Sequence, residues 1–178
     1  MPDDGKISGL YDRDFYEWSG QQARAIRAAR VALSDSRVND IRASLTEMDW
    51  ENIAEEIESL GKRDRRELQN RIATVIEHLI KLQFSPADEP REGWRDTVRR
   101  SRDEIEMLLD DSPSLRPMVP GLANKATRNA LRYAIDGLRN HAEIDGRNHA
   151  EIDGAASAIP AEFTQDQILN DWWPEART

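Results

Sequence analysis

The chain has 178 residues, no cysteine, and 34 acidic against 25 basic residues, which give a formal net charge of -9. The missing cysteine excludes disulfides, thiolate nucleophiles and cysteine-held metal clusters, and no apolar run approaches the roughly 18 residues of a membrane-spanning helix. The negative charge disfavours broad attraction to nucleic acid or anionic membranes. We expect a cytoplasmic protein that uses no cofactor and folds as one helical domain over residues 1–178.

The first predicted helix begins near Asp14, whose side chain is of the type that caps helix N-termini. Phe15, Trp18 and Ile26 follow at helical spacing, so we expect this helix to pack by its aromatic end. Residues 33–46 mix turn-forming with scattered apolar residues and predict a loop that ends in a helical turn.

The next segment, from Asp49 to Phe84, predicts a helical hairpin, with one helix over residues 50–60 and another over residues 63–84. Gly61 lies where a left-handed residue usually ends a helix. Apolar residues recur three and four apart in both helices, as in the seam of a bundle. These residues are Trp50, Ile53, Ile57 and Leu60, then Leu68, Ile72, Val75, Leu79 and Leu82.

Two further helices complete a predicted all-α bundle of about four to five helices. Pro86 and Pro90 break the chain, and the same apolar spacing then resumes. The apolar positions are Trp94, Val98, Ser101, Ile105 and Leu108, then Leu122, Ala126, Ala130, Tyr133 and Ala134. The C-terminal extension, residues 155–178, carries two adjacent tryptophans, and we expect it to pack back on the bundle because burial of apolar surface is favourable.

The octapeptide RNHAEIDG occupies residues 139–146 and is repeated without change at residues 147–154. We interpret this tandem repeat as a local duplication that lengthens the fifth helix or its loop. The alternative is a metal or proton-relay site, because His141 and Asp145, and likewise His149 and Asp153, are four residues apart. Asp and Gly near a helix end are ordinary turn residues, which favours the first interpretation.

Glutamates crowd the helix predicted over residues 50–60. At about 100° per residue, Glu51, Glu55 and Glu58 point away from the apolar stripe and predict a solvated face. Glu56 lies nearer the apolar stripe, and we expect it to be half-buried against a polar flank of the following helix. That flank consists of Arg71, Thr74, His78 and Lys81.

Glu56 and His78 are therefore the candidate catalytic residues. No metal is assigned, and Glu55, Glu58 and His78 are the candidate ligands if one binds. No phosphate-binding glycine loop, G-x-S-x-G elbow or H-E-x-x-H motif is present, so a boundary ion pair is a better interpretation of Glu56 and His78 than catalysis.

Arg95, Arg99 and Arg102 lie four and three residues apart and predict a basic strip on the fourth helix. Such a strip suits contact with phosphates or with an acidic partner. The alternative, which we favour, is internal pairing with the glutamates of the helix over residues 50–60.

Several sequence blocks, taken together and in order, resemble the bacterial Domain of Unknown Function 29 family. They are YDRDFYEW, NIAEEIESLGKRDRREL, EHLIKLQF, Trp94 with the arginine-rich helix after it, DSPSL and QILNDWWP. The resemblance implies an all-helical bundle in a small cytoplasmic bacterial protein, and it implies no established activity. The long segment over residues 32–46 and the octapeptide repeat depart from the family pattern.

The leading hypothesis is a noncatalytic helical protein that binds another protein or itself, with Trp172 and Trp173 exposed for contact. The first alternative is a metal-assisted hydrolase centred on Glu55, Glu56, Glu58 and His78. The second alternative is nucleic-acid binding through the strip of Arg95, Arg99 and Arg102.

Overall fold

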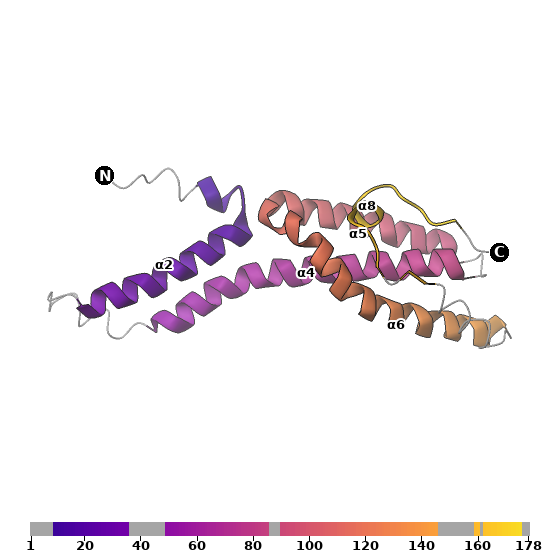
Figure 1. The fold of residues 1–178 in the computed structure, drawn as a ribbon, viewed down its shortest axis with the longest axis horizontal. Coiled ribbons are helices and arrows are strands. Elements are labelled where there is room, and N and C mark those ends of the chain that lie inside the picture. The colour runs from indigo at the N-terminus through magenta and orange to yellow at the C-terminus, as the bar shows by residue number, and fades with distance from the viewer. Residues whose placement is uncertain (1–8, 36–48, 86–89, 146–158, 161, 176–178) are drawn as a thin grey trace. The chain divides into compact units, whose positions relative to one another are not determined.

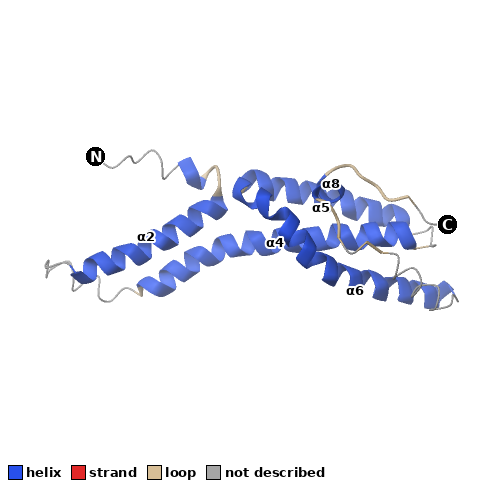
Figure 2. Ribbon diagram, in the orientation of Figure 1, coloured by secondary structure: helices blue, strands red, loops and turns tan. Residues whose placement is uncertain are grey.

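The computed structural model describes residues 9–35, 49–85, 90–145, 159–160 and 162–175. Helices make up most of these ranges, loops and turns make up the rest, and no strand lies within them, so the all-α prediction is confirmed (Figures 1 and 2). The elements in chain order are α2 (Phe15–Asp35), α4 (Trp50–Phe84), α5 (Arg91–Asp111), the 3-10 helix η1 (Pro113–Met118), α6 (Val119–Asp145) and α8 (Gln165–Leu169).

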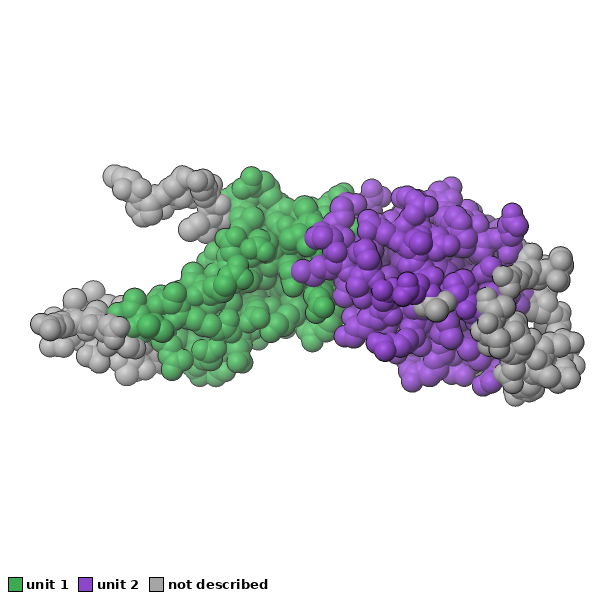
Figure 3. Space-filling model, in the orientation of Figure 1, with its two compact units in different colours: residues 1–66, 109–115 green, residues 67–108, 116–178 purple. Residues whose placement is uncertain are grey.

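The chain divides into two compact units, coloured separately in Figure 3. The first unit comprises residues 1–66 and 109–115, and the second comprises residues 67–108 and 116–178. Helix α4 contributes its first half to the first unit and its second half to the second. One helical domain over residues 1–178 stays a prediction.

The second unit has a conventional core formed by the second half of α4, α5 and α6. Large apolar side chains of α4 and α5 are fully or almost fully buried there, as the three-and-four spacing predicts. The largest are Leu68, Ile72, Val75, Ile76, Leu79, Ile80, Val98 and Ile105. Helix α6 instead contributes alanines, among them Ala123, Ala126, Ala130 and Ala134, so its backbone approaches closely. Tyr133, which we expected in this core, is exposed.

The break between α4 and α5 is stabilised by Arg91 at the start of α5. Its guanidinium donates hydrogen bonds to the carbonyl oxygens of Leu82 at 2.7 Å and Ser85 at 3.1 Å. These carbonyls lie at the C-terminus of α4, where intrahelical donors run out. The predicted break after Phe84 is therefore confirmed.

The C-terminal segment packs back on the second unit, as predicted. Its short helix α8 begins with a capping box in which Thr164 and Gln167 each accept from the other's backbone N–H. Phe163 and Ile168 are buried, and α8 packs against α6.

The first unit contains an antiparallel hairpin formed by α2 and residues 50–66 of α4, which we call the hairpin. The predicted cap Asp14 is confirmed, because its Oδ1 accepts from the backbone N–H of Glu17 at 2.9 Å. Asp14 also accepts from the N–H and hydroxyl of Ser114, at 2.7 and 2.8 Å, and thereby joins α2 to the segment 109–115 of the same unit. Helix α2 continues to Asp35, past the start of the predicted loop, whose remainder up to residue 46 lies outside the described residues.

The predicted helix stop at Gly61 is wrong, because α4 runs without interruption from Trp50 to Phe84. Gly61 is buried against α2, and a Cβ at this position would overlap the hydroxyl of Ser19 and lie 3.2 Å from the ring of Tyr16. The glycine is therefore needed for close approach of two helices, and not for a left-handed backbone. The hairpin that we expected between residues 50–60 and 63–84 does not exist.

Replacement of Gly61 by alanine should destabilise the protein. Alanine favours a helix by about 1 kcal/mol over glycine, but overpacking against Ser19 costs typically 1–3 kcal/mol. We expect a net loss of stability of up to about 2 kcal/mol in chemical denaturation, with weaker protection of α2 amides in hydrogen exchange.

Gly93→Ala is the matched control, because Gly93 is also helical and a Cβ there meets no atom within 4 Å. It should leave stability unchanged or raise it by up to about 1 kcal/mol. A Gly61→Ala protein as stable as Gly93→Ala would contradict the packing role of Gly61.

Candidate functional site

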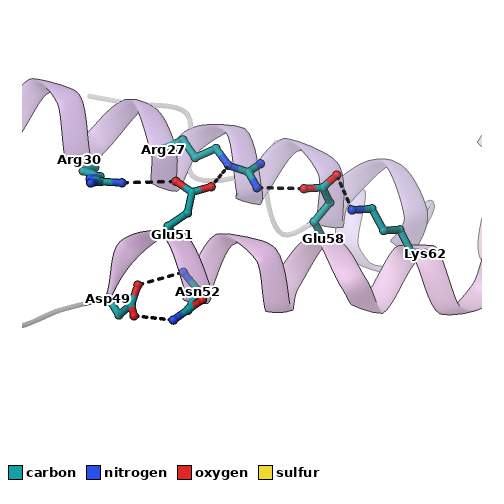
Figure 4. Close-up of polar contacts among 7 residues, drawn as sticks. All are labelled: Arg27, Arg30, Asp49, Glu51, Asn52, Glu58 and Lys62. Atoms are coloured by element: carbon teal, nitrogen blue, oxygen red, sulfur yellow. Dashed lines mark hydrogen bonds and ion pairs between the residues drawn. The ribbon is translucent and has the colours of Figure 1, made fainter.

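The two helices of the hairpin are joined by a ladder of ion pairs (Figure 4). Arg27 donates to Glu51 at 2.9 Å and to Glu58 at 3.0 Å, and so bridges two carboxylates one heptad apart on α4. Glu51 also pairs with Arg30 at 3.4 Å, and Glu58 with Lys62 at 3.1 Å. Late residues of α2 thus contact early residues of α4, which fixes the antiparallel direction.

The ladder corrects two predictions about the glutamates. Glu51 and Glu58 face α2, although we expected them on a solvated face. Lys62 first, and then Arg27, lower the pKa of Glu58, whereas Glu51 and Glu58 raise the pKa of Arg27. Both ends of the bridge therefore keep their charge at neutral pH.

The other two glutamates of interest point into solvent. The side chain of Glu56 is 69% exposed and has only a long ion pair with Arg63, at 3.5 Å, so its predicted half-buried position is wrong. Glu55 is exposed, as predicted. The prediction for Glu56 was wrong because α2 does not pack on the apolar stripe of α4. It packs beside that stripe, on a line of small and acidic residues of α4.

Small residues occupy the centre of the hairpin seam. Within the described part of α2 and residues 50–66 of α4, the buried residues are Ser19, Ala23, Ala54 and Gly61. Over residues 15–32 and 50–66, every large apolar side chain is half-buried or exposed. This is the reverse of the second unit, where the large side chains form the core.

Most of these large side chains share one face of the hairpin, and Tyr16, beside Gly61, and the exposed Val31 lie outside it. In α2, Trp18 and Ile26 stand one position before Ser19 and Arg27, and the polar Gln22 precedes Ala23. In α4, Ile53, Ile57 and Leu60 stand one position before Ala54, Glu58 and Gly61. A step of one residue turns each helix by about 100° in the same sense, and in antiparallel helices that places both stripes on the same side. The resulting apolar face consists of Phe15, Trp18, Ile26, Trp50, Ile53, Ile57 and Leu60.

His78 lies in the second unit, half-buried on α4 beside a close ion pair. Its Nδ1 is 2.9 Å from the carbonyl oxygen of Thr74, and Lys81 pairs with Glu77 at 2.6 Å. Gly137 of α6 packs against the end of the Lys81 side chain, where a Cβ would lie 2.8 Å from Cε. Burial lowers the pKa of His78, with a smaller contribution in the same direction from Lys81.

The structure does not bring the candidate catalytic residues together as we expected. Glu56 and His78 belong to one continuous helix, and the turn that was to face them toward each other is absent. Glu58, a candidate metal ligand, is committed to Arg27 and Lys62. Among the described residues, no three histidine, aspartate or glutamate side chains gather closely enough to hold a metal ion.

The predicted basic strip on α5 is divided between two roles. Arg99 pairs with Asp96 at 2.8 Å and with Glu92 at 3.5 Å, and Arg95 pairs with Glu92 at 3.7 Å. These partners stand on α5 itself. The expected pairing with glutamates of residues 50–60 is therefore wrong for both arginines, because acids of their own helix lie within reach.

Arg102 clamps the C-terminal segment instead of facing solvent. Its guanidinium donates to the carbonyl oxygens of Gln167 at 2.9 Å, Ile168 at 3.1 Å and Trp172 at 2.8 Å. It also lies 4.9 Å from the ring centroid of Trp173. The side chain is only 9% exposed, and burial lowers its pKa from the ordinary value, although an arginine keeps its charge in such a site.

The two tryptophans are half-buried, and not exposed for contact as we expected. Trp173 lies under Arg102, with Arg99 at 5.7 Å, and its indole N–H donates to Asp171 at 2.6 Å. Trp172 supplies a carbonyl to Arg102. These residues therefore anchor the segment to its own chain.

The octapeptide repeat is described only in part. Residues 139–145 lie in α6, so a helix carries His141 and Asp145 at the expected spacing. Nothing in the described structure places their side chains. His149 and Asp153 lie outside the described residues.

Sequence reasoning missed a group of cations on α6. Lys125, Arg128 and Arg132 are exposed, and none has an ion pair to an acidic residue within the described ranges. The signal was available, because the sequence from Ser112 to Ile135 has basic residues and no acidic one.

Arg102→Met should release the C-terminal segment. The change leaves three carbonyl oxygens without their donor, and each costs about 1–3 kcal/mol if it stays buried but less once the segment is released and water reaches it. We expect a loss of about 2–4 kcal/mol, a changed tryptophan fluorescence and faster hydrogen exchange over residues 163–173. Arg95→Met is the control on the same helix, and it should cost less than about 1 kcal/mol because its ion pair is exposed. Equal effects of the two changes would refute the clamp.

His78 should titrate below its ordinary pKa of 6.5. The unfolded chain then binds a proton more readily than the folded chain, so stability contributed by neutral His78 is complete above pH 6.5 and is lost as pH falls below it. NMR titration of the His78 ring measures the pKa. His78→Gln should flatten this part of the stability profile, and an unchanged profile would contradict the assignment.

In the described ranges, no helix combines the length and hydropathy needed to cross a bilayer. Comparison with curated proteins and with solved structures finds no match to the chain. A protein-family model described as "Domain of unknown function DUF29" matches residues 10–173, nearly the whole chain. The match covers the hairpin, the core of the second unit and the clamped C-terminal segment, and it bears out the resemblance of the sequence blocks. The chain therefore belongs to the DUF29 family.

Proposed function

We propose that this protein is a noncatalytic, cytoplasmic bacterial interaction protein, and that the apolar face of the hairpin binds a helical surface of another protein. The observation that supports the proposal is the inverted burial in the hairpin. Its small residues are buried in the seam, whereas its large apolar side chains are only half-buried or, as at Ile53, exposed. The family match carries no activity, so the proposal depends on this surface.

The hairpin does not need the apolar face for its own assembly. Gly61, Ala23 and Ala54 allow close contact, and Arg27 joins the helices through two carboxylates. A helix normally buries its apolar stripe against another element. Among the described residues, Tyr11 covers the aromatic end of this face, because its ring lies edge-on to Phe15 and Trp18 with centroids 5.6 and 4.8 Å apart. Ile53, farther along the face, is exposed. A partner helix laid along the face would supply the missing layer.

The opposite side of the hairpin is charged and exposed to solvent. One position after the seam stand Arg24 of α2 and Glu55 and Lys62 of α4, all exposed. This asymmetry distinguishes a contact face from scattered surface hydrophobics, which are ordinary on any protein. Ile53, at 37% exposure, is the most accessible large side chain of the apolar face.

Ile53→Glu should abolish partner binding without unfolding the protein. A carboxylate at a partly exposed position costs little in the free protein, but it would have to be desolvated in a complex. We expect at least a tenfold loss of a captured partner, equivalent to about 1.4 kcal/mol, in quantitative affinity capture from the source bacterium. Circular dichroism checks that the helices remain.

Ala28→Glu is the matched control, because it adds the same charge at an exposed position of α2 on the polar side of the hairpin, one position after Arg27. It should retain the partner. Two results would contradict the proposal: the wild type captures no protein that Ala28→Glu retains, or Ile53→Glu retains every protein that the wild type captures.

A further inference from the structure

Helix α6 presents a line of cations to solvent, which we call the basic stripe: Lys125, Arg128 and Arg132. These residues are three and four apart and therefore share one side of the helix, away from the buried alanines. Several arginines elsewhere in this unit contact acidic side chains or backbone carbonyls, as Arg71, Arg91 and Arg102 do, whereas Arg100 on α5 is exposed. The basic stripe has no such ion pair among the described residues.

Helix α5 of the same unit presents the opposite charge over residues 103–106, one turn after the exposed Arg99 and Arg100. Asp103 and Glu106 are exposed, three residues apart on the side away from Ser101 and Ile105, and form the acidic stripe. Neither has an ion pair to a described basic residue. Unpaired charges of both signs, at the same helical spacing, are thus present on one unit of one chain.

Each stripe has an exposed apolar neighbour. Met107, next to Glu106, is 66% exposed, and Tyr133, next to Arg132, is 53% exposed. The guanidinium of Arg132 lies 5.0 Å from the Tyr133 ring centroid. Methionine, tyrosine and arginine are enriched in protein interfaces, so both stripes have the composition of contact surfaces.

We propose that a second copy of this chain docks through these stripes, with the basic stripe of one copy against the acidic stripe of the other. Charge complementarity supports a second copy as the partner. Lys125 and Arg128 are three residues apart on α6, as Asp103 and Glu106 are on α5, so the two pairs of charges can face each other. The contact involves the second unit only and does not depend on the apolar face of the hairpin. It goes beyond the proposed function because it names a partner and a separate surface.

A polyanion is a poorer fit to the basic stripe than a second copy. The net charge of -9 repels phosphate over long distances, and three cations release few counterions. A polyanion would also leave the acidic stripe unused. A second copy uses both stripes, and the contact should be weak and salt-sensitive because exposed ion pairs are screened.

Sedimentation equilibrium of the full chain tests the proposal. The wild type should associate in a concentration-dependent manner at about 0.02 M salt and dissociate at about 0.5 M, where the Debye length is far shorter. Arg128→Glu with Arg132→Glu, and separately Asp103→Lys with Glu106→Lys, should each weaken self-association at least tenfold. A mixture of these two variants should associate again, because each then offers the charge that the other needs.

The control is Arg65→Glu with Arg66→Glu, which changes the net charge as much as the α6 reversal does, at exposed positions of α4. It should associate like the wild type, and so should Ile53→Glu, which separates this test from that of the proposed function. Arg128→Gln with Arg132→Gln should weaken association less than the reversal and guards against misfolding.

Three results would overturn the proposal. One is a wild type that stays monomeric at low salt, and another is an α6 reversal that still associates like the wild type. The third is tight binding of a single-stranded oligonucleotide that the α6 reversal abolishes while the protein alone remains monomeric, which would assign the basic stripe to phosphate. Recovery of association in the mixture of reversed variants supports docking of a second copy.

Discussion

The close approach of α2 to α4 at Gly61 determines the surface chemistry of the first unit. Two helix backbones can come this near only where side chains are small, and Ser19, Ala23 and Ala54 continue the same line. Small side chains bury little apolar area, so the seam relies on direct backbone proximity and on the Arg27 bridge. The large apolar residues are displaced to one side, the face that we propose as a contact surface.

The second half of α4 follows the opposite rule. Its leucines, isoleucines and valines meet α5 and α6 directly, and α6 provides alanines where these bulky side chains need room. One continuous helix thus combines a small-residue seam with a large-residue core. Residue size at the contact positions, and not hydrophobicity alone, distinguishes the two halves.

Much of the fold was predictable from the sequence, because apolar spacing, proline breaks and the Asp14 cap are local signals. The role of Gly61 was not, since a glycine that ends a helix and a glycine that admits a neighbouring helix look alike without the neighbour. The predictions for Glu51 and Glu58 were wrong for the same reason, because without the neighbouring helix we expected α4 to pack by its apolar stripe alone. The position of a residue on a helix gives the direction of its side chain, but the neighbouring helix decides whether that side chain is exposed to solvent.

The candidate site was less predictable than the fold. Arg102 looked like part of a basic strip because its acceptors are backbone carbonyls, which every residue possesses and which carry no sequence signal. The basic stripe of α6 was not predicted, because its cations are fewer and more widely spaced than the arginines of α5. The high density of arginines on α5 did not indicate unpaired cations. The lack of acidic residues between Ser112 and Ile135 was the better indicator.

The Arg102 clamp has a consequence for how the C-terminal segment can change during evolution. A guanidinium that recognises carbonyl oxygens makes no hydrogen bond to the side chain of Trp172, so a substitution there leaves all three acceptors in place, whereas Gln167 is needed separately for the capping box. The clamp is sensitive to chain length, because a residue inserted or deleted between Ile168 and Trp172 would move one acceptor out of register with the others. The clamp therefore constrains the number of residues between its acceptors more than the identity of their side chains.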